Sequence, residues 1–426
     1  MTLKNNFCSS PWINMRIGNA GNLEYCRWAN EQDPKLSENI RDITPVDFFQ
    51  KSMVPIRAAL LDGEALPRCG ECYQMEQHHK VSGRQKQLLK VGVRLEHFEK
   101  TLASSPWVKE FARGGTTDEL PQDWQIELGN YCNSACVFCL PEFSSKLAME
   151  HRQLGLIAQL PPPSWTDDPD LVDRFIDTLT QSPHIQYLHF IGGETVITPA
   201  FKTILSALVS SGMNRTVAIG FTTNLTVWRD DIEELLVQFA SVHLGMSLES
   251  FDAINDYVRW PVTLPTMNQQ LNRWTTLARK HNWYITLRTT PTVLSLSRLL
   301  TVYDYAWDQG ISVESCNFLN RPEFMRPAVL PLEYRQQELN RMNAWIAQHS
   351  TDLSHSKIVN IRDPNVFQQQ LVQDLQSYVA YLEAESDQSW RWPDLVQYLK
   401  KLETRRGNSI LNYLPEYEEL FRSAGY

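Results

Sequence analysis

Six short apolar segments alternate with helical patterns between residues 120 and 330, and this alternation constrains the fold more than any other feature of the chain. Short apolar runs are typical of buried strands, while the segments between them repeat apolar residues at helical spacing. Strands that alternate with helices pair in parallel through right-handed crossovers. We therefore expect an α/β fold, with strands near Trp124, Tyr187, Val217, His243, Tyr284 and Ser312.

A run of three cysteines follows the first of these strands. Cys132, Cys136 and Cys139 have the spacing C-x3-C-x2-C and share one tight loop. Three thiolates can bind three corners of a cubane iron–sulfur cluster and leave the fourth iron open to a substrate or cofactor. A zinc knuckle is the alternative, although structural zinc needs four ligands and this loop has no fourth Cys or His. The run therefore favours an iron–sulfur cluster with a catalytic role.

Short polar motifs follow the next three strands. The strand that ends at Ile191 runs into Gly192-Gly193-Glu194, the strand near Val217 leads into Thr222-Thr223-Asn224, and the strand near His243 ends at Ser247, before Glu249. The cysteine run followed by these motifs resembles the radical S-adenosylmethionine (radical SAM) superfamily over roughly residues 120 to 320. The sequence differs from the family pattern after Asn224, because Leu225 stands where the family often carries glycine.

The resemblance implies a partial (βα)6 barrel of the TIM type and a set of cofactor contacts. The three cysteines would bind a [4Fe-4S] cluster whose open iron takes the amino and carboxylate groups of S-adenosylmethionine. Core packing for Phe138, a turn for the glycines and a helix cap for Ser247 are the alternatives. The other implied contacts are Phe138 against adenine, Gly192, Gly193 and Glu194 at the methionine amino group, Ser247 and Glu249 at the ribose, and Asn224 and Arg259.

Four more cysteines lie upstream. Two strands around a glycine-asparagine turn place Cys8 and Cys26 near the ends of one hairpin, and a helix over 55–61 leads to Cys69 and Cys72, so the four thiolates can converge. The pattern resembles the twitch domain, a shortened relative of the SPASM domain, which holds one auxiliary [4Fe-4S] cluster in many radical SAM enzymes. In those relatives it usually follows the barrel, and here it precedes it. A structural zinc site fits the same spacing.

Side chains at the ends of the last two strands are candidates for substrate contact and catalysis. Arg288 ends the fifth strand, and Glu314 and Cys316 alternate on the sixth, so both can face inward. Arg288 and Arg259 could clamp a carboxylate or phosphate, and Cys316 could give a hydrogen atom to a substrate radical. The alternatives are a structural ion pair for each arginine and inert core packing for Cys316.

Length and composition are ordinary for a globular protein. The 426 residues, 42% of them hydrophobic, are enough for a twitch-like domain over 1–115, a barrel over 120–330 and a helical region over 331–426. We expect a cytoplasmic protein, because no leader or membrane-length apolar stretch occurs. Reduced thiols in that compartment favour metal binding over disulfides. A net charge of -9 argues against nucleic acid as a partner.

The resemblance also implies an activity. A radical SAM oxidoreductase or maturase cleaves S-adenosylmethionine reductively to a 5'-deoxyadenosyl radical, which abstracts hydrogen from the substrate. Relatives with the auxiliary domain commonly act on peptides, so we expect a peptide or protein substrate and an electron donor such as flavodoxin or ferredoxin. The same chemistry on a sugar, aminocyclitol or nucleotide-like metabolite is one alternative. A zinc- or cluster-stabilised binding module without catalysis is the other.

Overall fold

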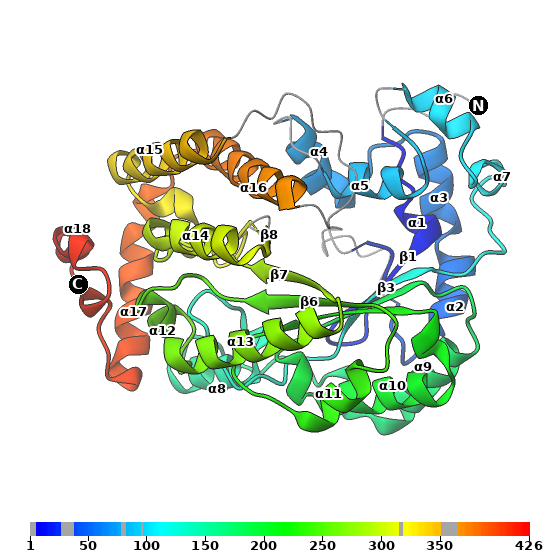
Figure 1. The fold of residues 1–426 in the computed structure, drawn as a ribbon, viewed down its shortest axis with the longest axis horizontal. Coiled ribbons are helices and arrows are strands. Elements are labelled where there is room, and N and C mark those ends of the chain that lie inside the picture. Colours follow the sequence, from blue (N-terminus) through cyan, green and yellow to red (C-terminus); the bar gives the residue numbers. More distant parts are fainter. Residues whose placement is uncertain (1–5, 27–37, 78–81, 95–96, 315–317, 351–363) are drawn as a thin grey trace. The chain divides into compact units, whose positions relative to one another are not determined.

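The computed structural model describes residues 6–26, 38–77, 82–94, 97–314, 318–350 and 364–426 (Figure 1). The chain forms two compact units, each built from segments that are distant in the sequence. The first unit comprises Met1–Gly129, Pro162–Phe221 and Asp230–Val242, and the second comprises Asn130–Pro161, Thr222–Arg229 and His243–Tyr426. The domain limits expected from the sequence, at 115/120 and 330/331, stay a prediction.

The strands of the first unit form one sheet with the order β2-β1-β3-β4-β5. β1 and β2 form the predicted antiparallel hairpin, and β1 also pairs in parallel with β3. β3 pairs with β4 and β4 with β5, both in parallel. The N-terminal segment therefore extends the sheet that carries the first strand–helix units. The strands are β1 (Asn14–Ile17), β2 (Leu23–Glu24), β3 (Asp123–Glu127), β4 (Tyr187–Ile191) and β5 (Ala218–Thr223).

Ser10–Ile13 is a helical turn, α1, where the sequence predicted the start of a strand. Pro11 lies in its first turn, where the fixed φ and missing N–H of proline suit a helix and disfavour a strand ladder. The other N-terminal helices are α2 (Pro45–Asp47), α3 (Val54–Leu61), α4 (Gly70–Gln77), α5 (Gly83–Lys90), α6 (Phe98–Ala103) and α7 (Val108–Phe111).

Three crossover helices of the first unit, α9 (Pro169–Thr180), α10 (Pro199–Ser210) and α11 (Asp230–Leu236), lie side by side (Figure 1). α9 begins at Asp168, whose carboxylate accepts the N–H groups of Asp170 and Leu171 and so caps the helix. Its buried face includes Phe175, whose ring contacts the buried rings of β3 and of the segment before α9. The helices expected here from apolar spacing are confirmed.

The second unit contains the parallel strands β6 (Val242–Ser247), β7 (Tyr284–Arg288) and β8 (Ser312–Glu314), paired in that order. The six predicted strands are therefore all present, alternate with helices, and give the α/β class that the sequence predicted. α15 and α16 pack against each other (Figure 1), and the C-terminal region is helical as expected. The helices are α8 (Ser145–Gln153), α12 (Ile254–Val258), α13 (Leu264–Lys280), α14 (Leu300–Gln309), α15 (Leu332–His349), α16 (Pro364–Ala384), α17 (Trp392–Arg406) and α18 (Glu418–Ser423).

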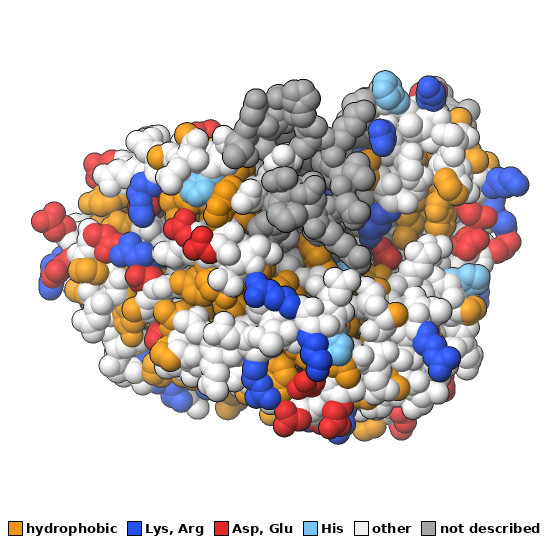
Figure 2. All heavy atoms as spheres, viewed as in Figure 1, with side chains coloured by type: hydrophobic (Ala, Val, Ile, Leu, Met, Phe, Trp, Pro, Cys, Tyr) orange, Lys and Arg blue, Asp and Glu red, His pale blue; other side chains and the backbone are white. Residues whose placement is uncertain are grey.

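The described surface carries charges of both signs. On the face drawn in Figure 2, basic and acidic side chains of the described residues are interspersed with polar and hydrophobic ones. A continuous basic area is the surface that binds nucleic-acid phosphates, and the described side chains of this face do not form one. Among the helices that the structure describes, none has the length and apolar character needed to cross a bilayer.

Candidate functional site

The three-cysteine loop lies in the second unit, and its thiols are partly buried. The N–H of Ser134 points to Cys132 Sγ at 3.4 Å, and the Asn224 amide lies 3.9 Å from the same sulfur. Burial raises the pKa of the Cys139 thiol, and the neighbouring sulfurs of Cys136 and Cys132 raise it further. Burial also raises the pKa of the Cys136 thiol. Neighbouring thiols that resist ionisation on their own are donors that a bound cation would satisfy. The residues therefore fit an iron–sulfur cluster held by three protein ligands.

Asn224 organises the start of this loop. Its Nδ2 donates to Asn133 Oδ1 at 3.0 Å and to Ser134 Oγ at 3.1 Å, and its Oδ1 accepts the N–H of Thr226 at 3.1 Å. Leu225, which replaces the family's glycine, has φ +60 and is fully buried. The backbone therefore keeps a left-handed conformation at this position without glycine. The contacts of Asn224 reach the cluster loop, while its predicted role towards the cofactor stays a prediction.

Arg259 and Glu249 form a buried ion pair next to the loop. Arg259 Nη2 lies 2.6 Å from Glu249 Oε1, and Glu249 Oε2 accepts the Thr289 hydroxyl at 3.0 Å and the Thr290 N–H at 2.7 Å. The Arg259 guanidinium also lies 5.6 Å from the centre of the Phe138 ring, within cation–π range. Both Glu249 oxygens thus have protein partners, and ribose binding by this residue stays a prediction.

The Gly192-Gly193-Glu194 motif lies in the first unit, directly after β4. Gly192 has φ +147, and a Cβ added to it would lie 2.7 Å from the Gly129 carbonyl oxygen. The N–H of Gly193 donates to the same oxygen at 2.8 Å. Glu194 is buried, and its Oε1 accepts the N–H of Val196 at 3.3 Å. The motif therefore needs glycine at 192, so that the end of β4 can approach the end of β3.

The predicted substrate side chains at β7 and β8 contact one another. Arg288 Nη1 donates to Thr222 Oγ1 at 2.9 Å, and Arg288 Nε lies 3.1 Å from Glu314 Oε2. A Cβ at Gly245 would lie 2.7 Å from Arg288 Nε, so this glycine makes room for the arginine. Ser247 ends β6 beside Arg288 and is partly buried. Cys316 lies outside the described residues, and its predicted role stays untested.

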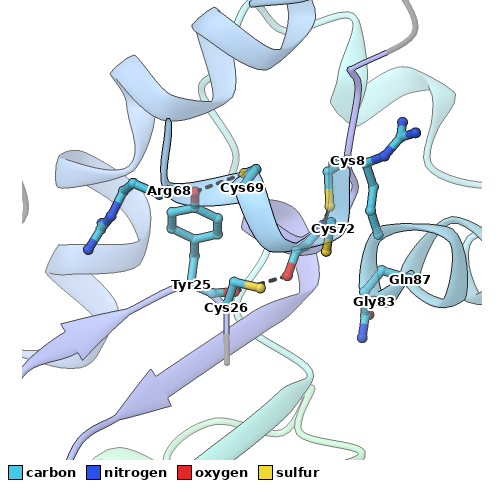
Figure 3. Close-up of a pocket in the computed structure, with 10 residues that line it drawn as sticks. Cys8, Tyr25, Cys26, Arg68, Cys69, Cys72, Gly83 and Gln87 are labelled. Carbon is cyan, nitrogen blue, oxygen red and sulfur yellow. Dashed lines mark hydrogen bonds between the residues drawn. The ribbon is translucent and has the colours of Figure 1, made fainter. Parts of the chain in front are cut away.

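The four upstream cysteines line one pocket of the first unit, together with Tyr25, Ser10, Arg68 and Arg84 (Figure 3). Burial raises the pKa of the Cys8 thiol, and the other three sulfurs raise it further. Burial likewise raises the pKa of Cys72 to about 11. Cys8, Cys26, Cys69 and Cys72 thus share the lining of one pocket. Whether a cluster or zinc binds them stays a prediction.

Ser10 and Tyr25 connect three of these four cysteines. The N–H of Ser10 points to Cys8 Sγ at 3.5 Å, and its hydroxyl donates to the Tyr25 carbonyl oxygen at 3.0 Å. The Tyr25 hydroxyl lies 3.7 Å from Cys69 Sγ (Figure 3), and Tyr25 is the chain neighbour of Cys26. Burial raises the pKa of Tyr25, so the phenol stays protonated and can donate to sulfur. Sequence reasoning missed both residues, although the Tyr-Cys pair was visible.

A buried charge network links this pocket to β3. Arg16 binds Glu127 through Nε at 2.8 Å and faces Glu24 at 3.4 Å, and Arg68 of the pocket lies 3.8 Å from Glu24. All four side chains are less than a tenth exposed. Burying such charges costs free energy unless they are paired, and each of these side chains lies within 4 Å of one of opposite charge. The sequence did not predict this network, because single charged residues on strands usually face solvent.

The seven cysteines that the structure describes are free thiols. Among the described side chains, no group of three or more His, Cys, Asp or Glu residues lies in an arrangement that could hold a single metal ion.

Parallel strands with helical crossovers and a three-cysteine loop just beyond a strand end define a class: α/β proteins that carry several thiols after a strand. Residues 126–284 match the family model of the radical SAM superfamily. This stretch, about a third of the chain, therefore has the sequence of a radical SAM domain. The match includes the cysteine loop and the motifs after β4, β5 and β6.

Comparison with solved structures found distant likenesses. Streptococcus suis SuiB bound to S-adenosylmethionine is 14% identical with a TM-score of 0.39, and the match covers 83% of this chain and 72% of SuiB. SuiB bound to its precursor peptide SuiA is 15% identical with a TM-score of 0.36, covering 66% and 60%. The protein anSMEcpe with bound AdoMet is 14% identical with a TM-score of 0.39, covering 54% and 61%. A search of curated proteins found no match. The assignment therefore rests on the family match and the cysteine loop.

Proposed function

We propose that the protein is a peptide- or protein-modifying radical SAM enzyme with a second cluster at its N-terminal four-cysteine site. The observation that carries this proposal is the division of the seven described cysteines into two sets. One set has three thiols on a loop of the radical SAM domain, and the other has four thiols around one pocket. A set of three leaves a metal vertex open to a cofactor, whereas a set of four saturates a cubane.

The three-thiol set suits the cofactor that the family uses. When bound, the cluster and S-adenosylmethionine together supply a 5'-deoxyadenosyl radical that abstracts hydrogen from the substrate. The chain's own residues would hold this centre. Asn224 fixes the first cysteine, and the buried Arg259–Glu249 pair places a positive charge beside Phe138.

The four-thiol set suits electron transfer. With every iron bound by protein, this cluster would carry an electron away from the substrate radical and would not bind the substrate itself. The Tyr25 hydroxyl and the Ser10 N–H point to two of its sulfurs, and hydrogen bonds of this kind tune reduction potentials. The peptide class of substrate is supported by the resemblance of this N-terminal part to the twitch domain.

Anaerobic reconstitution tests the proposal. We expect about eight irons per chain, and formation of 5'-deoxyadenosine and methionine after addition of a reductant. Cys132→Ala should remove about half of the iron and abolish cleavage, while Cys69→Ala should lower the iron content and leave cleavage intact. Stoichiometric zinc at the N-terminal site would rule out the electron-transfer role. A protein that takes up no iron at Cys132, Cys136 and Cys139 would rule out the radical chemistry.

Mass spectrometry separates the two substrate classes. Peptides encoded near the gene and small polar metabolites are incubated with the reconstituted enzyme in separate reactions. We expect a mass loss of two hydrogens or a new cross-link in a peptide. Conversion of a metabolite alone would contradict the peptide assignment and leave the radical chemistry in place.

A further inference from the structure

Backbone hydrogen bonds hold the loop on both sides of Cys136. Ala135 and Val137, on either side of this cysteine, are both fully buried. Their N–H groups donate to the carbonyl oxygens of Trp260 at 2.7 Å and Val258 at 2.9 Å. Because buried carbonyl groups also need partners, the two remaining oxygens must be satisfied from elsewhere.

Helix α17 supplies both partners, although it lies more than 250 residues further along the chain. Arg406 Nη2 donates to the Ala135 oxygen at 2.8 Å, and the Tyr398 hydroxyl donates to the Val137 oxygen at 3.1 Å. All four backbone polar groups next to Cys136 are therefore bonded, two of them to a helix beyond the end of the radical SAM match at residue 284.

The two side chains of α17 are themselves held by α8, which follows the cluster loop. Arg406 binds Glu150 through two parallel hydrogen bonds, with Nε 2.9 Å from Oε1, and both residues are less than a tenth exposed. His151 Nε2 lies 3.0 Å from the Tyr398 hydroxyl, which must accept there because its single hydrogen goes to Val137. A bidentate arginine–carboxylate pair fixes both distance and orientation.

We propose that α17 is a clamp for the cluster loop, in which Arg406 and Tyr398 hold the carbonyl groups on both sides of Cys136 and keep its thiol positioned for the cluster. The clamp assigns a role to the C-terminal helical region, in which the sequence shows no recognisable chemistry. Arg406 and Tyr398 are positioning residues, since they act through the loop backbone. The inference rests on the proposed function only in taking an iron–sulfur cluster as the group that Cys136 binds.

The test measures how firmly the cluster is held, independently of turnover. Tyr398→Phe removes one hydroxyl, and Arg406→Gln removes the bidentate pair. Arg405→Gln on the same helix is the matched control, because Arg405 is exposed. Each reconstituted protein is mixed with an iron chelator, and iron release and the electron paramagnetic resonance spectrum with and without S-adenosylmethionine are followed. The N-terminal site serves as an internal reference.

We expect about tenfold faster release of the loop iron in Arg406→Gln and a smaller acceleration in Tyr398→Phe, with release from the N-terminal site unchanged. The spectral response to S-adenosylmethionine should change in both variants, and Arg406→Lys should restore part of it through one remaining bond to Ala135. The clamp would be overturned if Tyr398→Phe and Arg406→Gln fold and show the same rate of iron release and the same spectra as the wild type. If Arg406→Gln does not fold, Tyr398→Phe alone decides. Wild-type protein with no iron on the loop would instead overturn the proposed function, and the clamp with it.

Discussion

Gly192→Ala tests whether the glycine motif after β4 is required by backbone packing. The φ of +147 at Gly192 is a region that residues with a Cβ adopt only under strain, at a cost of about 2 kcal/mol. The added Cβ would also lie 2.7 Å from the Gly129 oxygen and 3.2 Å from the Leu128 nitrogen, both of which are backbone atoms. A shift large enough to relieve this contact would weaken the hydrogen bonds from Leu128 to Ile191 and from Gly193 to Gly129.

Each of these two bonds contributes about 1 kcal/mol, so the total loss of stability should be about 4 kcal/mol. Gly212→Ala is the matched control, because Gly212 has φ +79 in open space and should lose only about 1 kcal/mol. Anaerobic thermal unfolding of the two variants and the wild type measures the difference, and calorimetry measures S-adenosylmethionine binding. We expect an unfolding midpoint several degrees lower in Gly192→Ala than in Gly212→Ala, with weaker binding. Equal midpoints in the two variants would refute the packing argument.

Three further predictions follow from single contacts. Tyr25→Phe removes the hydroxyl that faces Cys69, so the midpoint potential of the N-terminal site should fall, because a donor to sulfur stabilises the reduced, more negative cluster. Tyr257→Phe is the control, since the Tyr257 hydroxyl binds Glu403. An unchanged potential in Tyr25→Phe would refute the contact. Asn224→Ala leaves Asn133 and Ser134 without this donor, so the loop should lose about 1–3 kcal/mol and release iron faster, which chelator kinetics would measure against the N-terminal site. Burial lowers the pKa of His243, so below its unfolded value of about 6.5 the unfolded chain binds a proton that the folded chain does not. The free energy of unfolding should therefore fall with decreasing pH, by at most about 1.4 kcal/mol per pH unit. In His243→Gln the melting temperature should depend less on pH between about pH 7.5 and 5.5 than in the wild type.

The strands and the cysteine loop could be predicted because each depends on local sequence. Tyr187–Ile191 is a mostly apolar strand whose predicted bounds are those observed, and the spacing of Cys132, Cys136 and Cys139 is visible within eight residues. The convergence of the upstream cysteines was also predictable, because the hairpin of β1 and β2 and the helix before Cys69 are both local elements.

Contacts between distant segments could not be predicted in this way. The parallel pairing of β1 with β3 joins residues more than 100 positions apart, and the sequence of Asn14–Ile17 does not indicate which strand will pair with it. The pairs Arg16–Glu127 and Arg406–Glu150 are similar, because a lone charged residue gives the same signal whether it faces water or a buried partner. The sequence therefore located the thiols, while only the structure located the residues that hold them.

These supporting contacts divide between the two cysteine sets in a way that bears on mechanism. The four-thiol site is braced from within its own region by Ser10 and Tyr25, whereas the three-thiol loop is held by Asn224, by Val258 and Trp260, and by α17. Each set can therefore be loosened by substitutions that leave the contacts of the other unchanged. If electrons pass from the substrate to the N-terminal site, loosening that site should stop product formation while S-adenosylmethionine is still cleaved. Loosening the loop should stop both.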